Sequence, residues 1–201
     1  MSSEEKKTRL PQIAVGITGA SGVLYGTQLL KRLAESPVQV HLIVSEYGIR
    51  VLREEVDIEF EPERPETFAN LWPGNRGALH VHSCHNIGAA PATGSEDIRA
   101  FVICPCSMST LGRLAGGISD NLITRMGGVA LKERRPLILV PRETPLSTIH
   151  LRNMVTLSEA GAVVMPACPG FYQEPRSVND LVGFMVDRVM QHLRLPHLCS
   201  P

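Results

Sequence analysis

The chain has 201 residues, of which 43% are hydrophobic, and its twenty basic and twenty acidic side chains give a formal net charge of zero. This length suffices for one domain with a sizeable core. The balanced charge, without a basic run, argues against nucleic acid and anionic membranes as partners and leaves a small molecule as the expected partner.

The terminal segments and the cysteines predict a cytoplasmic protein. No apolar run approaches the roughly 20 residues that span a bilayer, and residues 1–11 are charged where a signal peptide would be apolar. The five cysteines are odd in number and lie mostly in or beside apolar runs, which favours reduced thiols. We therefore expect a flexible leader at 1–11, one domain at 12–195 and a short tail at 196–201.

Short apolar runs alternate with helical patterns along the chain. The runs predict buried parallel strands at 12–18, 38–45, 100–104, 136–141 and 162–166. Helical spacing of apolar residues covers 21–35, 122–135, 147–160 and 178–195. The proline-rich stretch 54–97 is harder to interpret, with one strand expected near 79–82. This alternation predicts an α/β fold, a single three-layer domain with a Rossmann- or flavodoxin-like parallel sheet.

The first predicted strand leads directly into the glycine-rich segment 16–22 (GITGASG) and a helix, where backbone N–H groups converge on an anion or a ring edge. The glycine spacing differs from the G-x-G-x-x-G of dinucleotide binders, and the second strand ends in Ser45 instead of an acidic residue. Glu46 follows, but its side chain is expected to point away. The pattern favours a mononucleotide such as FMN, although a packing turn would have a similar sequence. Ser21 would either cap the helix or face the ligand.

A second loop of this kind follows the strand at 100–104. Segment 105–111 (PCSMSTL) places a proline and three hydroxyl side chains at the start of a helix, which again suits an anion. Capping accounts for one such hydroxyl more easily than for three. Because both loops follow neighbouring parallel strands, they are expected to meet at the carboxyl edge of the sheet, where α/β proteins bind ligands.

Five segments occur in the order and spacing of one enzyme family, namely 18–22 (TGASG), 104–107 (CPCS), 131–137 (LKERRPL), 141–145 (PRETP) and 170–172 (GFY). The chain from Ile13 to about Leu195 thereby resembles the UbiX flavin prenyltransferases. Flavin-dependent cysteine decarboxylases resemble only the first loop and the general fold. The resemblance implies a metal-independent enzyme that joins the dimethylallyl group of dimethylallyl phosphate to N5 and C6 of reduced FMN. It also implies a homododecamer with subunit-shared sites, and a UbiD-type decarboxylase as recipient of prenylated FMN.

The resemblance also implies a set of site residues. FMN would be held by Gly19, Ala20, Ser21, Ser45, Ser107, Met108, Ser109, Thr110 and Arg142. The prenyl phosphate would be held by Arg125, Lys132, Tyr172 and Arg188. The catalytic residues would be Ser21, Glu55 and Glu143, with Glu143 carrying a proton between flavin and phosphate. Two aromatic residues of some family members, one around Ile87 and a C-terminal tryptophan, are missing here.

Simpler roles are open for several of these residues. The cations at 132–135 could cap a helix C-terminus, Arg142 and Glu143 could form a structural ion pair, and Arg188 could be a solvated side chain. Segment 80–85 (HVHSCH) carries metal-ligand types, but no second ligand pair follows at zinc-site spacing, so no metal is expected.

Two rival functions are a flavin-dependent decarboxylase and a non-catalytic flavin-binding subunit. The decarboxylase class uses a histidine in a different loop context, whereas His150 lies inside a helical pattern. Binding of FMN alone does not call for the charges of Lys132, Arg142, Glu143 and Arg188, which argues against the second rival.

Overall fold

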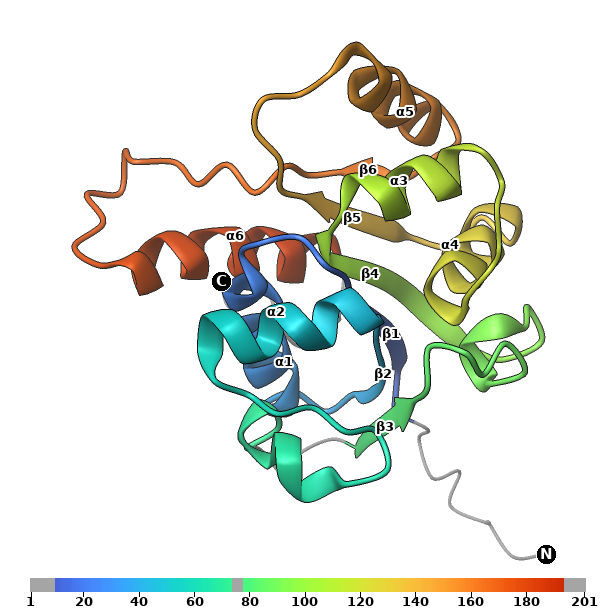
Figure 1. The fold of residues 1–201 in the computed structure, drawn as a ribbon, viewed down its shortest axis with the longest axis horizontal. Coiled ribbons are helices and arrows are strands. Elements are labelled where there is room, and N and C mark those ends of the chain that lie inside the picture. The colour runs from blue at the N-terminus through green and yellow to red at the C-terminus, as the bar shows by residue number, and fades with distance from the viewer. Residues whose placement is uncertain (1–9, 74–77, 194–201) are drawn as a thin grey trace, which may run out of the picture.

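The computed structural model describes residues 10–73 and 78–193, which form a parallel sheet of order β3-β2-β1-β4-β5-β6 (Figure 1). The strands are β1 (Gln12–Ile17), β2 (Gln39–Val44), β3 (Ala78–His82), β4 (Ile98–Cys106), β5 (Leu137–Pro141) and β6 (Val163–Val164). The predicted leader lies outside the described residues except for 10–11, as do the end of the predicted domain and the whole tail at 196–201. The α/β class and the parallel sheet are confirmed.

Helices cover both faces of this sheet. They are α1 (Val23–Ala34), α2 (Glu46–Val56), α3 (Met108–Ala115), α4 (Leu122–Lys132), α5 (Thr148–Glu159) and α6 (Val178–His192), with short 3₁₀ turns η1 (Pro65–Leu71) and η2 (Ala90–Ala92). One apolar cluster joins the sheet to α1, α2 and α6, and a second joins it to α3, α4 and α5. These two clusters make the three layers that the alternating pattern predicts. Within the described ranges, no helix combines the length and apolar character needed to cross a bilayer.

Two parts of the predicted element map need correction. Helix α2 is missing from it, because its 11 residues bury only Gly48 and Leu52 and so carry little apolar periodicity. The strand expected at 162–166 is regular only at Val163–Val164. Beyond it, the N–H groups of Met165 and Ala167 still donate to carbonyls of β5, at 2.8 and 2.9 Å, so the edge of the sheet continues in an irregular form.

The order of the strands creates a crevice at the centre of the sheet. From β1 the chain adds β2 and β3 on one side, then crosses to add β4, β5 and β6 on the other. The helices that follow β1 and β4 therefore lie on opposite faces of the sheet, and the crevice between their loops at the carboxyl edge is the usual ligand position in such sheets. Helix α1 approaches β4 closely here, because a Cβ atom at Gly26 would lie 2.4 Å from the carbonyl oxygen of Cys104.

The histidines of 80–85 belong in part to a hydrogen-bonded stack on one face of the sheet. His41 of β2 is buried, with Nδ1 2.9 Å from Nε2 of His82 and Nε2 2.8 Å from Oε1 of Gln12. His80 stacks on the His41 ring, with centroids 5.2 Å apart. Within residues 10–73 and 78–193, no three histidine, cysteine, aspartate or glutamate side chains are grouped so that they could hold a metal ion. His82 therefore serves a packing network in this fold.

This network predicts a dependence of stability on pH. Burial, and then the neighbouring His82, lower the pKa of His41 to about 4. Because His41 stays neutral in the folded protein while the unfolded chain protonates below pH 6.5, stability is full above pH 6.5 and falls as the pH drops toward 4. We expect a loss of about 2 kcal/mol between pH 7 and 5, measured by urea denaturation. The variant His41→Gln, which does not titrate, should lose less over the same interval, and equal losses would contradict this assignment.

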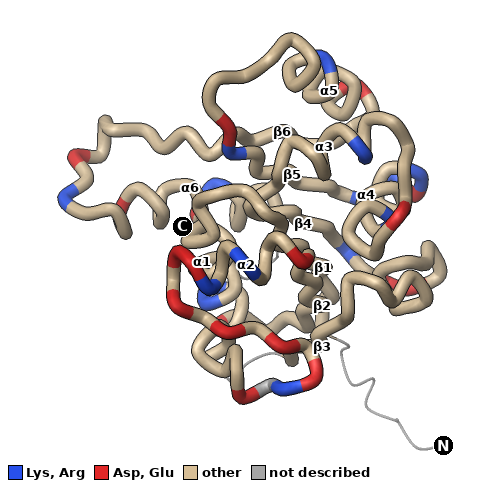
Figure 2. Tube along the Cα trace, in the orientation of Figure 1, with Lys and Arg blue, Asp and Glu red and all other residues tan. Residues whose placement is uncertain are grey.

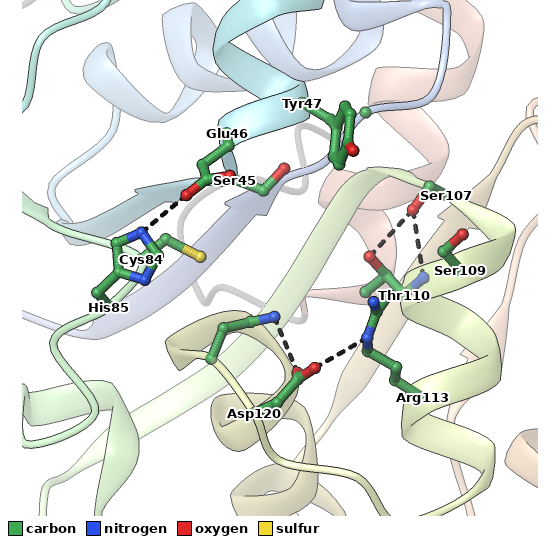
Figure 3. A pocket seen from close by; sticks show the side chains of 12 residues that line it. Ser45, Glu46, Tyr47, Cys84, His85, Ser107, Ser109, Thr110, Arg113 and Asp120 are labelled. Carbon is green, nitrogen blue, oxygen red and sulfur yellow. Dashed lines mark hydrogen bonds and ion pairs between the residues drawn. The ribbon is translucent and has the colours of Figure 1, made fainter.

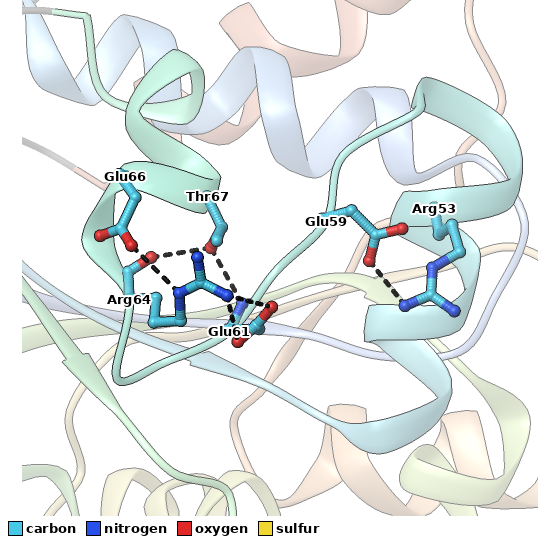
Figure 4. Close-up of polar contacts among 6 residues, drawn as sticks. All are labelled: Arg53, Glu59, Glu61, Arg64, Glu66 and Thr67. Atoms are coloured by element: carbon cyan, nitrogen blue, oxygen red, sulfur yellow. Dashed lines mark hydrogen bonds and ion pairs between the residues drawn. The ribbon is translucent and has the colours of Figure 1, made fainter.

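An acidic surface segment, residues 57–66, runs from the end of α2 into η1 (Figure 2). Its carboxylates pair with two arginines, Arg53 with Glu59 at 2.6 Å and Arg64 with Glu66 at 3.1 Å and Glu61 at 3.3 Å (Figure 4). All of these side chains are at least half exposed, and each such ion pair contributes about 0–1 kcal/mol to stability. The segment is thus a solvated acidic face whose ion pairs add little to stability.

Candidate active site

A cavity of about 600 Å³ opens at the carboxyl edge of the sheet, a size typical of small-molecule sites. It is lined by Gly19, Ser45, Glu46, Tyr47, Cys84, His85, Ser107, Ser109, Thr110, Arg113, Asp120 and Asn121. Figure 3 shows the hydroxyls at the start of α3 on one side and Ser45, Glu46 and His85 on the other. The loops after β1, β2, β3 and β4 thus converge where the sequence predicts a ligand.

The N-terminus of α3 forms one wall of this cavity. Ser107 caps the helix, since its Oγ accepts the N–H of Thr110 at 3.2 Å and lies 3.0 Å from the Thr110 hydroxyl. Among the hydrogen bonds of the described residues, none gives an acceptor to the N–H groups of Met108 or Ser109. Free N–H groups at a helix start, with hydroxyls beside them, bind phosphate-like anions. The predicted anion site of the second loop is therefore open.

The N-terminus of α1 is arranged differently. Its N-cap, Gly22, has φ +97° and no capping side chain. The Glu55 carboxylate of α2 takes this place and accepts the N–H of Gly22 at 2.9 and 3.2 Å and that of Val23 at 3.0 Å. Ser21 therefore does not cap the helix, and its exposed side chain leaves the ligand-facing alternative standing. Its backbone oxygen accepts Nε–H of Arg142 at 2.8 Å.

Thr18 fixes the two loops to each other, a role that the sequence reasoning missed. It is buried, its hydroxyl donates to the carbonyl of Pro105 at 2.9 Å, and it accepts the N–H of Ser107 at 2.7 Å. A second close approach holds the first loop against α2, because a Cβ atom at Gly19 would lie 2.3 Å from that of Tyr47. The glycine loop and the α3 terminus thus keep a defined separation.

Several lining residues escaped the sequence reasoning. Glu46 was expected to point away, but it lines the cavity, and its Oε1 lies 3.0 Å from Nε2 of His85. The expectation fails because Glu46 is the first residue of α2, so the alternation of a strand does not apply to it. Cys84 and His85 follow β3, and the carboxyl-edge rule applied to the strand at 79–82 would have found them. Burial raises the pKa of the Cys84 thiol, which keeps it protonated.

The residues expected on the phosphate side do not line this cavity. Arg142 and Glu143 follow β5 at the same edge, and Glu143 accepts the N–H of Thr144 at 3.0 Å. The ion pairs of the described chain include none between Arg142 and Glu143, so that structural alternative is not realised. Tyr172 is 77% exposed and packs edge-on against Phe184 of α6, with ring centroids 5.7 Å apart. Arg188 is exposed on α6 and donates to Gln191 at 2.7 Å.

Helix α4 separates two further candidates. Its N-cap Asn121 lines the cavity, and Arg125 lies one turn along, exposed. Lys132 ends the helix ten residues after Leu122, roughly 15 Å along the axis, beside Glu133 and near the opposite edge of the sheet. Arg135 is structural, because its guanidinium donates to backbone oxygens in the loop at 94–96, at 2.6 and 2.7 Å. One subunit therefore does not bring Lys132 to its own cavity.

Comparison with known proteins decides the family. The family model described as Flavoprotein matches residues 1–190. The flavin prenyltransferase UbiX of Pseudomonas aeruginosa is 45% identical over 193 residues, which cover 94% of this chain and 92% of that protein. The UbiX of Methanocaldococcus jannaschii is 42% identical over 182 residues, covering 90% and 92%. The chain belongs to the UbiX family of flavin prenyltransferases. The family predicted from the five segments is thus confirmed.

Solved structures place the fold in the same group. AnUbiX (PadA1), in complex with FMN and dimethylallyl pyrophosphate, aligns with a TM-score of 0.84 at 37% identity, covering 93% of this UbiX-family chain and 94% of its own. A dodecameric FMN-dependent UbiX-like decarboxylase from Escherichia coli O157:H7 aligns with a TM-score of 0.82 at 36% identity, covering 94% and 98%. The cysteine decarboxylase TvaF, at 19% identity and a TM-score of 0.58, shares the fold alone.

Proposed function

We propose that this UbiX-family protein transfers the dimethylallyl group of dimethylallyl phosphate to N5 and C6 of reduced FMN. The observation that carries the proposal is the open α3 terminus, whose free N–H groups and hydroxyls face a cavity of about 600 Å³ beside the glycine loop. This donor set fits a ribityl phosphate, and the α1 terminus already holds the Glu55 carboxylate. Kinship to proteins named flavin prenyltransferase supports the reaction.

In this arrangement, the FMN phosphate binds at Ser107, Ser109 and Thr110, with Ser45 on the other wall. The flavin ring extends toward Gly19, Ala20 and Ser21, where Arg142 already contacts the loop through the Ser21 carbonyl. Reduced flavin supplies the nucleophilic N5 and the ring carbon C6.

The chain's own charged residues act on the leaving group. The C–O bond of the donor breaks as the carbon bonds to N5, and Arg142, Arg188, Arg125 and Tyr172 stabilise the departing phosphate through charge-assisted and neutral hydrogen bonds. Glu143 carries the proton released from N5 to the phosphate. The second bond then joins C6 to the substituted alkene carbon of the prenyl group, as the other alkene carbon gains a proton and C6 loses its own. Neither step changes the number of electrons, so the reaction is redox-neutral. No metal is required, because guanidinium groups supply the positive charge.

We further propose that Lys132 serves the site of a neighbouring copy in a homo-oligomer. Lys132 lies near the edge of the sheet opposite to its own cavity. Helix α5 leaves Ile149 and Val155 more than half exposed, and this apolar face suits contact with another subunit. The dodecameric relative from Escherichia coli supports the same stoichiometry here.

Subunit sharing predicts complementation. Lys132→Ala and Glu143→Gln should each remove most activity, but hetero-oligomers refolded from an equal mixture should recover roughly a quarter of the parent activity, because some shared sites contain neither substitution. Phosphate release from the mixture measures this recovery. A mixture of Glu143→Gln with Glu143→Ala is the control and should recover nothing. Failure of the first mixture, with hetero-oligomers verified by mass, would place Lys132 outside the site.

The proposed activity is tested by phosphate release under anaerobic conditions. The purified protein should release inorganic phosphate from dimethylallyl phosphate only when reduced FMN is present. Oxidised FMN should give none, because its N5 is not nucleophilic. Phosphate release without any flavin would indicate a phosphatase and would reject the proposal.

The rival decarboxylase function finds no support in the geometry of His150. This residue lies at the third position of α5, and its Nδ1 accepts the N–H of Ser147 at 3.3 Å as part of a capping box. Its ring is therefore engaged in capping the start of the helix. Delivery of prenylated FMN to a UbiD-type decarboxylase is a proposal that rests on the family alone, and the cytoplasmic location stays a prediction.

A further inference from the structure

Glu55 holds an unusual position between two helices. It lies on the last turn of α2, and its carboxylate reaches the first turn of α1, 33 residues earlier in the chain. Both carboxylate oxygens accept backbone N–H groups, from Gly22 at 2.9 and 3.2 Å and from Val23 at 3.0 Å. A glycine N-cap has no side chain of its own to satisfy these donors. The carboxylate thus occupies the place that a dissolved or ligand-borne anion would otherwise take.

The neighbouring loop residue is tethered separately. Arg142 donates to the Ser21 carbonyl at 2.8 Å, so the loop keeps one anchor that does not depend on Glu55. Thr18 anchors the start of the same loop through Pro105 and Ser107. The loop is held at both of these points, so Glu55 is not its only anchor. Besides accepting the two N–H groups, Glu55 places a negative charge at the α1 terminus.

Two helix termini face the same edge of the sheet, and the reaction brings two phosphates there, one on FMN and one on the prenyl donor. Either terminus could bind either phosphate if both were open. The α3 terminus is open and the α1 terminus carries a carboxylate. We propose that Glu55, beyond the catalytic role that the family resemblance implies, closes the α1 terminus to phosphate. The flavin phosphate then enters at α3, and the donor phosphate stays with Arg142 and Arg188. This inference rests on the proposed function.

The test counts phosphate bound to flavin-free oligomer. Equilibrium dialysis with radiolabelled inorganic phosphate should give one more bound phosphate per subunit for Glu55→Ala than for the parent. The matched control is Glu54→Ala, which changes the net charge equally on the same helix but removes only an exposed pair with Arg50. Glu54→Ala should bind the same number of phosphates per subunit as the parent. An extra phosphate in Glu54→Ala would attribute the effect to net charge and overturn the proposal.

A second variant covers the case in which Glu55→Ala does not fold. Glu55→Gln keeps the length of the side chain but loses the charge, so phosphate should displace the amide and again add one per subunit, more weakly than in Glu55→Ala. A lowered melting temperature with the parent number of phosphates would reduce Glu55 to a structural cap and contradict the inference. The dialysis contains neither flavin nor prenyl donor, so failure of the proposed reaction would appear separately, in the phosphate-release assay of the parent.

Discussion

Ser109→Asp should weaken FMN binding about 100-fold and leave riboflavin binding unchanged. The substitution places a carboxylate at the α3 terminus, where it accepts the free N–H groups and repels the ribityl phosphate, and charge-assisted hydrogen bonds of this kind are worth about 1.5–3 kcal/mol each. Riboflavin has no phosphate and should not sense the new charge. Fluorescence titration of the flavin-free protein with each flavin measures both affinities.

The control for this experiment is Ser177→Asp. Ser177 caps α6 and does not line the cavity, so the same substitution at another helix start should change neither affinity. Equal losses of FMN and riboflavin in Ser109→Asp would mean that the cavity itself is damaged. Unchanged FMN affinity would show that the FMN phosphate does not bind at α3. The proposed orientation of the flavin would then be wrong as well.

Arg188→Ala and Glu143→Gln should both spare FMN binding but affect the prenyl donor in different ways. Arg188→Ala removes a charge-assisted phosphate contact, so dimethylallyl phosphate should bind roughly 10- to 100-fold more weakly. Glu143→Gln keeps the shape but cannot carry a proton, so the donor should bind while product formation stalls. Tyr172→Phe loses one neutral hydrogen-bond donor, so it should weaken the binding of dimethylallyl phosphate less than Arg188→Ala does.

Single-turnover absorbance of the flavin, at several donor concentrations, separates these effects into binding and rate. Arg32→Ala is a suitable control, since Arg32 is an exposed arginine paired with Asp187, the sequence neighbour of Arg188. If Arg188→Ala and Glu143→Gln bind dimethylallyl phosphate and form product as the parent does, neither residue belongs to the phosphate side of the site.

The parts of the fold that the sequence predicts well are those set by local pattern. The residues of β1 are all buried, with helices on both faces of the sheet, so the strand reads as a continuous apolar run. Helix α2 escaped because it is largely exposed, and its apolar residues are too few to mark a period. The hydroxyl-rich start of α3 is also a local pattern, because a strand, a proline and three hydroxyl residues follow one another in the sequence.

The parts that could not be predicted depend on contacts distant in sequence. Nothing in the spacing says that Glu55 reaches Gly22 across 33 residues, or that Thr18 bonds to Pro105 across 87. The position of Lys132 at the far edge likewise follows from the direction in which α4 crosses the sheet. Residues of this kind need the fold before a role can be assigned to them.

The mass of the flavin after reaction tests the central claim most directly. Reduced FMN, dimethylallyl phosphate and the purified protein are incubated without oxygen, and the released flavin is examined by mass spectrometry and by NMR. We predict a flavin heavier by one dimethylallyl group less one hydrogen, with new bonds at N5 and C6. Recovery of FMN with unchanged mass, from protein that binds FMN and the donor, would contradict the proposed prenyl transfer.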